Sequence, residues 1–209
     1  METKVHFTSS GYRLEGCLDE GSSRAVVITH PHSLYGGNMH NPVVATIAKI
    51  FQQRGYTTLR FNFRGVENSQ GAYDEGRGER EDVRQAVAYL QKQGFGPIEL
   101  SGYSFGVWVN AHFAAESLPA IRMSMVSPPT AFMDFRGIQH LPGLTLVLTG
   151  SRDDIAPREM LQRLVPIWNP AASLEVVPGA DHFFAVHLED LGNSLRHALD
   201  ALPAFASER

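Results

Sequence analysis

The sequence predicts an α/β protein in which helices cover both faces of a mainly parallel sheet. Short apolar runs rich in β-branched residues alternate along the chain with longer segments of helical periodicity. Strands that alternate with helices are joined by crossovers, so the strands run parallel and are buried between two helical layers. The start of the chain differs, because VHFTS and YRLEGCL flank a Ser-Gly turn and predict an antiparallel hairpin.

The remaining elements follow from the same patterns in chain order. Asn41 and Pro42 have the residue types of a helix N-cap and a first helical position, and Gly55 is expected to end that helix. Strands are expected at 25–30, 57–63, 97–104, 121–127, 144–150 and 173–179, and apolar stripes predict further helices around 83–90, 161–165 and 188–199. The segment 105–118 is apolar almost all round, which is typical of a buried helix.

Length and composition predict one soluble domain over residues 1–209. Apolar residues make up 43% and charged residues 19% of the chain, as in an ordinary globular protein. Lys and Arg total 18 against 22 Asp and Glu, a formal net charge of −4, so we expect no nucleic-acid and no membrane partner. With one cysteine, no secretory signal and no apolar run long enough to span a membrane, the expected location is cytoplasmic.

The segment Gly102-Tyr103-Ser104-Phe105-Gly106 places a serine between a predicted strand and a predicted helix. Such a turn is too tight for large side chains two positions either side of the serine, which explains both glycines. It exposes the hydroxyl at the start of a helix, whose free N–H groups face the same site. The pattern therefore predicts that Ser104 is a nucleophile.

The groups that a nucleophilic serine needs follow the later strands. Asp153 and Asp154 come just after the strand at 144–150, and His182 comes just after the strand at 173–179. A hydroxyl needs a histidine base, and the histidine needs a carboxylate that orients it. Because the carboxyl ends of parallel strands share one edge of the sheet, these residues predict a catalytic triad in which either aspartate can serve.

Over its whole length the sequence resembles an α/β-hydrolase. It is most similar to small bacterial members without a lid, close to the dienelactone-hydrolase-like and carboxylesterase-like ones. Besides the serine motif, the matching segments are His30-Pro31-His32 with Gly36-Gly37-Asn38-Met39, Arg60-Phe61-Asn62-Phe63-Arg64-Gly65-Val66, Gly150 to Pro157, and Asp181-His182-Phe183-Phe184. Together these motifs are specific for the fold and not for a substrate.

The resemblance implies a choice between the two aspartates. In the family, an aliphatic residue follows the triad aspartate after two positions and proline follows it after four. Asp153 stands in that register with Ile155 and Pro157, and Asp154 does not.

The resemblance also implies an oxyanion hole made of two backbone N–H groups. One comes from Phe105, directly after the nucleophile, and the other from the loop after the strand at 25–30. This loop begins with His-Pro where His-Gly is commoner in the family, and Pro31 has no N–H. His32 is therefore the expected second donor, with Ser33 and Leu34 as alternatives.

These residues together predict a serine hydrolase that cleaves small carboxylic esters or thioesters through an acyl-enzyme, with no metal and no organic cofactor. The same triad also serves a small peptidase or amidase, and the fold also serves non-catalytic interaction proteins, so both alternatives stay open. The expected partner is a small-molecule substrate. The oligomeric state stays open too, with a homodimer as one option.

Two other patterns have simpler explanations than a binding site. His30, His32 and His40 lie close in sequence, but they lack the cysteine or carboxylate partners of a metal site. The glycines at 71–78 lack the lysine of a phosphate-binding loop and the spacing of a dinucleotide site, and they predict a flexible loop.

The connection between the strands at 121–127 and 144–150 is the place where many α/β-hydrolases carry a lid. Here it spans only residues 128–143, which are too few for a cap with a core of its own. We therefore expect minimal or no lid, a Ser104 that is open to solvent, little enclosed apolar volume, and a preference for short soluble esters.

Overall fold

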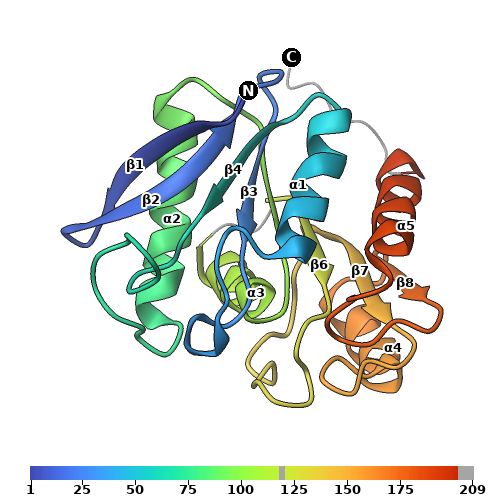
Figure 1. Ribbon diagram of the computed structural model, residues 1–209. Coiled ribbons are helices and arrows are strands. Elements are labelled where there is room, and N and C mark those ends of the chain that lie inside the picture. The colour runs from blue at the N-terminus through green and yellow to red at the C-terminus, as the bar shows by residue number, and fades with distance from the viewer. Residues whose placement is uncertain (118–120, 202–209) are drawn as a thin grey trace.

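The computed structural model describes residues 1–117 and 121–201, which form one sheet of eight strands with helices on both faces (Figure 1). The order across the sheet is β1-β2-β4-β3-β5-β6-β7-β8. The strands are β1 (Thr3–Ser9), β2 (Tyr12–Asp19), β3 (Ala25–Thr29), β4 (Thr57–Phe61), β5 (Ile98–Gly102), β6 (Met123–Val126), β7 (Leu144–Gly150) and β8 (Ser173–Val177). The hairpin of β1 and β2 joins β4 antiparallel, and every other neighbouring pair is parallel. The predicted α/β fold with an N-terminal antiparallel hairpin is confirmed.

Five α-helices of the described residues form two layers around this sheet. On one face lie α1 (Pro42–Gln53) and α5 (Leu188–Ala201), which pack against each other in front of the sheet in Figure 1. On the other face lie α2 (Arg77–Lys92), α3 (Phe105–Ser117) and α4 (Arg158–Trp168). Each layer buries its own apolar cluster against the sheet, so the strands are covered on both sides.

The start and the end of α1 are those that the sequence predicts. The side chain of Asn41 accepts a hydrogen bond from the Val43 N–H at 2.9 Å, which caps α1. Gly55 has a φ of 78° in the turn after that helix, a conformation that glycine adopts without strain. The predicted end of the helix at residue 118, and the predicted domain end at 209, lie outside the described residues.

The register of the parallel strands brings their carboxyl ends to one edge of the sheet. Thr29 at the end of β3 pairs with Gly102 at the end of β5, and Gly150 at the end of β7 pairs with Val177 at the end of β8. The loops that follow these four strands therefore open at the same edge. This is where ligand sites form in open parallel sheets.

The connection from β6 to β7 contains turns and no helix or strand. Its apolar residues Phe135, Ile138 and Leu141 are buried in the core beneath it, so the segment is fixed to the body of the protein. The prediction that it carries no separate cap is confirmed. Within the described residues, none of the helices combines the length and the apolar character that crossing a membrane requires.

Candidate active site

Ser104 lies in a sharp turn between β5 and α3. Its φ is 55°, in the left-handed region that residues other than glycine rarely adopt. The Ser104 N–H donates to the carbonyl of Val126 at 3.0 Å, which helps to hold this strained backbone in place. A Cβ atom added at Gly102 or Gly106 would collide with the Thr29 hydroxyl. The glycine spacing around the serine is therefore required by the close approach of β3.

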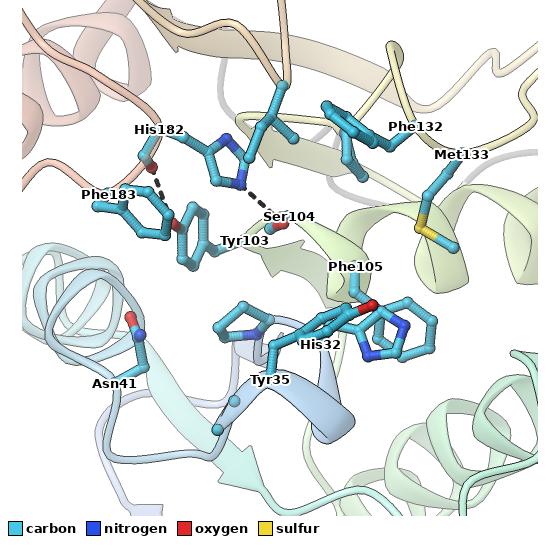
Figure 2. Close-up of a pocket in the computed structure, with 15 residues that line it drawn as sticks. His32, Tyr35, Asn41, Tyr103, Ser104, Phe105, Phe132, Met133, His182 and Phe183 are labelled. Atoms are coloured by element: carbon cyan, nitrogen blue, oxygen red, sulfur yellow. Dashed lines mark hydrogen bonds between the residues drawn. The ribbon is translucent and has the colours of Figure 1, made fainter.

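Three side chains from three loops meet at this turn. Ser104 Oγ lies 2.9 Å from Nε2 of His182 (Figure 2). Nδ1 of the same ring lies 3.0 Å from both carboxylate oxygens of Asp153. Because a carboxylate only accepts hydrogen bonds, the imidazole carries its proton on Nδ1 and its Nε2 accepts from the serine hydroxyl. The structure thus brings together the serine, aspartate and histidine that the sequence predicts.

Asp153 is held as an ionised carboxylate by its surroundings. Its Oδ1 accepts from the N–H groups of Ile155 at 3.0 Å and Ala156 at 2.7 Å, and the Thr149 hydroxyl donates to Oδ2 at 3.3 Å. Burial opposes ionisation, but the hydrogen bond and charge of His182 and the bond from Ala156 outweigh it, so the pKa of Asp153 is lowered. Asp154 is exposed to solvent, and the choice of Asp153 over its neighbour agrees with this geometry.

Tyr103 joins the serine turn to the histidine loop, a contact that the sequence did not predict. Its hydroxyl donates to the backbone carbonyl of His182 at 2.8 Å, and its ring lies 5.3 Å from the imidazole, centroid to centroid. The side chain is buried, and burial raises the pKa of its hydroxyl, which stays protonated and donating. The available signal was a tyrosine next to the serine in a buried strand-to-helix turn, since a buried hydroxyl needs a partner.

His32, the second oxyanion donor that the sequence predicts, lies in the loop after β3. Among the described residues, no protein acceptor takes a hydrogen bond from the backbone N–H of Phe105 or of His32. The rings of these two residues pack together at 4.7 Å between centroids, so the loop lies against the start of α3. The His32 ring accepts from the Leu34 N–H at 3.2 Å and lies 3.3 Å from the Tyr73 hydroxyl, while burial lowers its pKa.

His30 fixes the start of the same loop from inside the protein. Its Nδ1 lies 2.6 Å from the carbonyl oxygen of Pro31, and its Nε2 accepts from the Phe63 N–H at 3.0 Å. The side chain is completely buried, and this burial lowers its pKa to about 4. His30 therefore acts as a neutral, structural group. Within the described part of the chain, no three His, Cys, Asp or Glu side chains are grouped to hold a metal ion.

We expect the stability of the protein to fall between about pH 6.5 and the His30 pKa of about 4. In that range the unfolded chain binds a proton that the folded chain does not, so the contribution of His30 is complete above the unfolded pKa and is lost on acidification. The loss amounts to about 3 kcal/mol at most. Denaturant unfolding at several pH values, on wild type and on His30→Gln, measures it. The exposed His140→Gln serves as the control, and equal pH slopes in wild type and His30→Gln would contradict the assignment.

Ser104 and His182 open into a cavity of about 700 Å³, the size of a small-molecule site (Figure 2). Tyr35 from the short 3-10 helix Ser33–Tyr35, Phe132 and Phe183 line it. Only 9% of Ser104 is exposed, so the hydroxyl lies on the floor of the cavity. The prediction of little apolar volume beside the serine is wrong, because loop side chains form cavity walls that the length of the β6–β7 connection does not indicate.

Comparison with solved structures decides the family. An α/β serine hydrolase homologue from Coxiella burnetii superimposes with a TM-score of 0.87 and is 32% identical, over 94% of this chain and 97% of that one. The chain belongs to the α/β-hydrolase family. A further α/β-hydrolase from Xanthomonas campestris, described as a serine hydrolase without a lid, gives a TM-score of 0.88 at 30% identity, over 98% of this chain and 97% of that one.

A relative of this α/β-hydrolase among curated proteins is the uncharacterized protein RP471 of Rickettsia prowazekii. It is 31% identical over an alignment 209 positions long, which covers 94% of this chain and 88% of the relative. No protein-family model matches the chain. The likeness to α/β-hydrolases without a lid agrees with the short β6–β7 connection described above.

Proposed function

We propose that this α/β-hydrolase is a serine hydrolase that cleaves carboxylic esters or thioesters through an acyl-enzyme on Ser104. The observation that carries the proposal is the distance of 2.9 Å between Ser104 Oγ and His182 Nε2, with the Asp153 carboxylate on the opposite ring nitrogen. This arrangement lets the histidine take the serine proton while the carboxylate holds the required tautomer. The cavity in front of Ser104 leaves room for the substrate.

In the first half of the reaction, Ser104 Oγ attacks the substrate carbonyl carbon and its proton passes to His182 Nε2. The carbonyl oxygen becomes an oxyanion, which accepts hydrogen bonds from the N–H groups of Phe105 and His32. When the tetrahedral intermediate collapses, the bond to the leaving oxygen or sulfur breaks and His182 returns the proton to that atom. The acyl group stays on Ser104.

In the second half, His182 takes a proton from water as the water oxygen attacks the acyl carbon. Collapse of this intermediate breaks the bond to Ser104 Oγ, which recovers its proton from His182, and the carboxylic acid leaves. Asp153 remains ionised throughout and stabilises the imidazolium that forms in both halves. The downward shift of its pKa supports this role.

A fluorophosphonate probe tests the proposal directly. Attack by Ser104 Oγ on phosphorus forms an O–P bond and expels fluoride, so the folded protein is expected to gain a covalent label that peptide mass spectrometry places on Ser104. Ser104→Ala is the control that loses the label. A folded wild-type protein that takes no label would favour a non-catalytic interaction protein on this fold.

Matched substrates then separate the possible leaving groups. The panel consists of an oxygen ester, a thioester and an anilide of the same acyl group, each assayed for kcat/KM with Ser104→Ala as the blank. We expect the ester and the thioester to be cleaved faster than the anilide, because the amine is a poorer leaving group than an alcohol or a thiol. Preferential cleavage of the anilide would instead identify an amidase.

Tyr103→Phe is expected to lower kcat about 10-fold with little change in KM, because small displacements of catalytic groups are costly. The substitution keeps the ring and removes only the hydrogen bond to the His182 carbonyl. Tyr56→Phe is the matched control, since it loses a buried hydroxyl bond of 2.7 Å to Glu99, which lies at the opposite end of β5 from the serine turn. Equal kinetic effects of the two substitutions would show that Tyr103 contributes only stability.

A further inference from the structure

Exposed apolar side chains gather at the mouth of the active-site cavity. Among the described residues, eight large apolar side chains are exposed: Met1, Tyr12, Leu34, Tyr35, Phe132, Ile167, Phe183 and Val186. Three of them line this one cavity, namely Tyr35 at 87% exposure, Phe132 at 75% and Phe183 at 66%. They come from three separate loops, so they surround the opening instead of forming a flat patch. Apolar surface concentrated in this way indicates a binding site.

The cavity extends to two sides of Ser104. Figure 2 shows Phe183 and Tyr103 on one side of the serine, and Phe132 and Met133 on the other. We call the space beside Phe183 the histidine-side lobe, since that ring contacts His182 edge-on at 5.7 Å between centroids. The space beside Phe132 and Met133 is the loop-side lobe, because both residues belong to the β6–β7 connection.

The two lobes match the two halves of an ester. His182 must return a proton to the leaving oxygen, so the alcohol part has to lie next to the imidazole, in the histidine-side lobe. The acyl part then extends to the other side of Ser104, into the loop-side lobe. Each lobe offers an aromatic ring to its half of the substrate.

In the described part of the chain, the cavity lining also offers no oppositely charged side chain to a charged substrate. Among the described residues that border the cavity, none is Asp, Glu, Lys or Arg. A carboxylate, phosphate or ammonium group of the substrate would lose water there without gaining an opposite charge, which is unfavourable. Asp154 and Asp181 are exposed and adjoin the lining residues Ile155 and His182 in the chain, so their carboxylates disfavour an anionic lipid surface as the occupant.

We infer that the cavity selects uncharged esters with a bulky apolar group on both sides of the carbonyl. The acyl group lies against Phe132 and Met133, and the alcohol group lies against Phe183. This inference rests on the proposed function and names the substrate class of the same site. It replaces the preference for short esters that the sequence predicts.

Two ester series with separate variants test the division into lobes. The acyl series compares 4-nitrophenyl 3-phenylpropionate with 4-nitrophenyl acetate, and the alcohol series compares 2-phenylethyl acetate with ethyl acetate. The readout is the ratio of kcat/KM for the large ester over the small one, which cancels any general loss of catalysis. We expect Phe132→Ala to lower the acyl ratio about 10-fold and to change the alcohol ratio less than about 2-fold, and Phe183→Ala to do the reverse.

Ile167→Ala is the control, since this apolar residue of α4 is 55% exposed and does not border the cavity. It is expected to change neither ratio. The inference is overturned if Phe132→Ala and Phe183→Ala lower both ratios alike, or if neither lowers any. A jump in rate above the solubility limit of the two large esters would also overturn it, in favour of a lipid surface.

A pair of esters of the same length tests the exclusion of charge. Monoethyl glutarate carries a carboxylate where ethyl pentanoate carries a methyl group. We expect kcat/KM to be at least about 10-fold lower for the charged ester, because its carboxylate would be desolvated without a partner. Equal values for the two esters would refute the exclusion.

Binding to Ser104→Ala separates a failure of this inference from a failure of the proposed function. This variant is expected to bind 2-phenylethyl acetate without turnover, and saturation-transfer NMR detects the bound ester. Suppose that the signal is lost in the double variant Ser104→Ala/Phe183→Ala and that wild type hydrolyses none of the esters. The two lobes would then stand, and the proposed hydrolase activity would be refuted. Hydrolysis by wild type with unchanged binding in the double variant would refute the lobes alone.

Discussion

Replacing His182 by alanine is expected to lower kcat by about 10⁴-fold or more, and Ser104→Ala is expected to lower it equally. The two residues act as one unit, since the serine proton can leave only to the ring nitrogen 2.9 Å away. The double variant should therefore be no slower than either single variant. Initial rates on 2-phenylethyl acetate at high enzyme concentration measure all three.

Circular dichroism and thermal unfolding check that the variants fold. Both side chains lie on a cavity wall, so removing them leaves no void inside the apolar clusters. Effects that multiply in the double variant would show that the two residues work independently. Either single variant keeping more than about a tenth of the wild-type kcat would exclude the triad, given the size expected of such losses.

Asp153→Asn is expected to lower kcat by about 10⁴-fold, whereas Asp154→Asn should change it less than about 2-fold. The amide would present an N–H group to His182 Nδ1, which favours the tautomer whose Nε2 carries the proton and cannot accept the one from Ser104. Two backbone N–H groups also bond Oδ1 of Asp153, so the substituted side chain keeps its place.

The neighbouring aspartate is the internal control for this comparison, because it is exposed and adjacent in the chain. Steady-state kinetics on one ester, with both variants made in parallel, provide the test. If Asp154→Asn were the slower enzyme, Asp154 and not Asp153 would be the carboxylate that orients His182 in solution.

Most of the fold could be predicted because local chemistry decides it. The cap at Asn41, the stop at Gly55 and the hairpin turn each depend on a few adjacent residues. The β-branched runs can be buried only as central strands, so the parallel sheet follows from their alternation with helices. Strand ends were less predictable: the strand expected to reach residue 104 ends at Gly102, where the strained turn begins.

The three principal site residues could also be predicted, because a sheet with parallel strands brings the ends of β5, β7 and β8 to one edge. The choice between Asp153 and Asp154 needed the family resemblance, since both follow the same strand. The roles of Tyr103 and His30 could not be predicted. Each depends on a hydrogen bond to a residue more than thirty positions away, and no local pattern specifies such a partner.

The cavity was the least predictable part of the site. Its volume depends on how far Phe132 and Phe183 stand away from the surface, which is a matter of loop conformation and side-chain rotamers. A count of residues in the β6–β7 connection excludes a cap domain, but it says nothing about walls built from single side chains. Loop length and pocket volume are therefore separate properties.

In the part of the chain that the structure describes, the β6–β7 connection carries no cap domain, and this affects whether an acyl group on Ser104 would pass to water or to another acceptor. An enzyme that closes over its substrate excludes bulk solvent and can hold an activated acyl group for a chosen acceptor. In this protein nothing in the described residues has to move before water reaches Ser104 from the open cavity. Water from the solvent then competes with any alcohol or amine for the acyl group. An acyl group on Ser104 would thus be released by hydrolysis much more often than it would be transferred, and no opening step would limit the turnover.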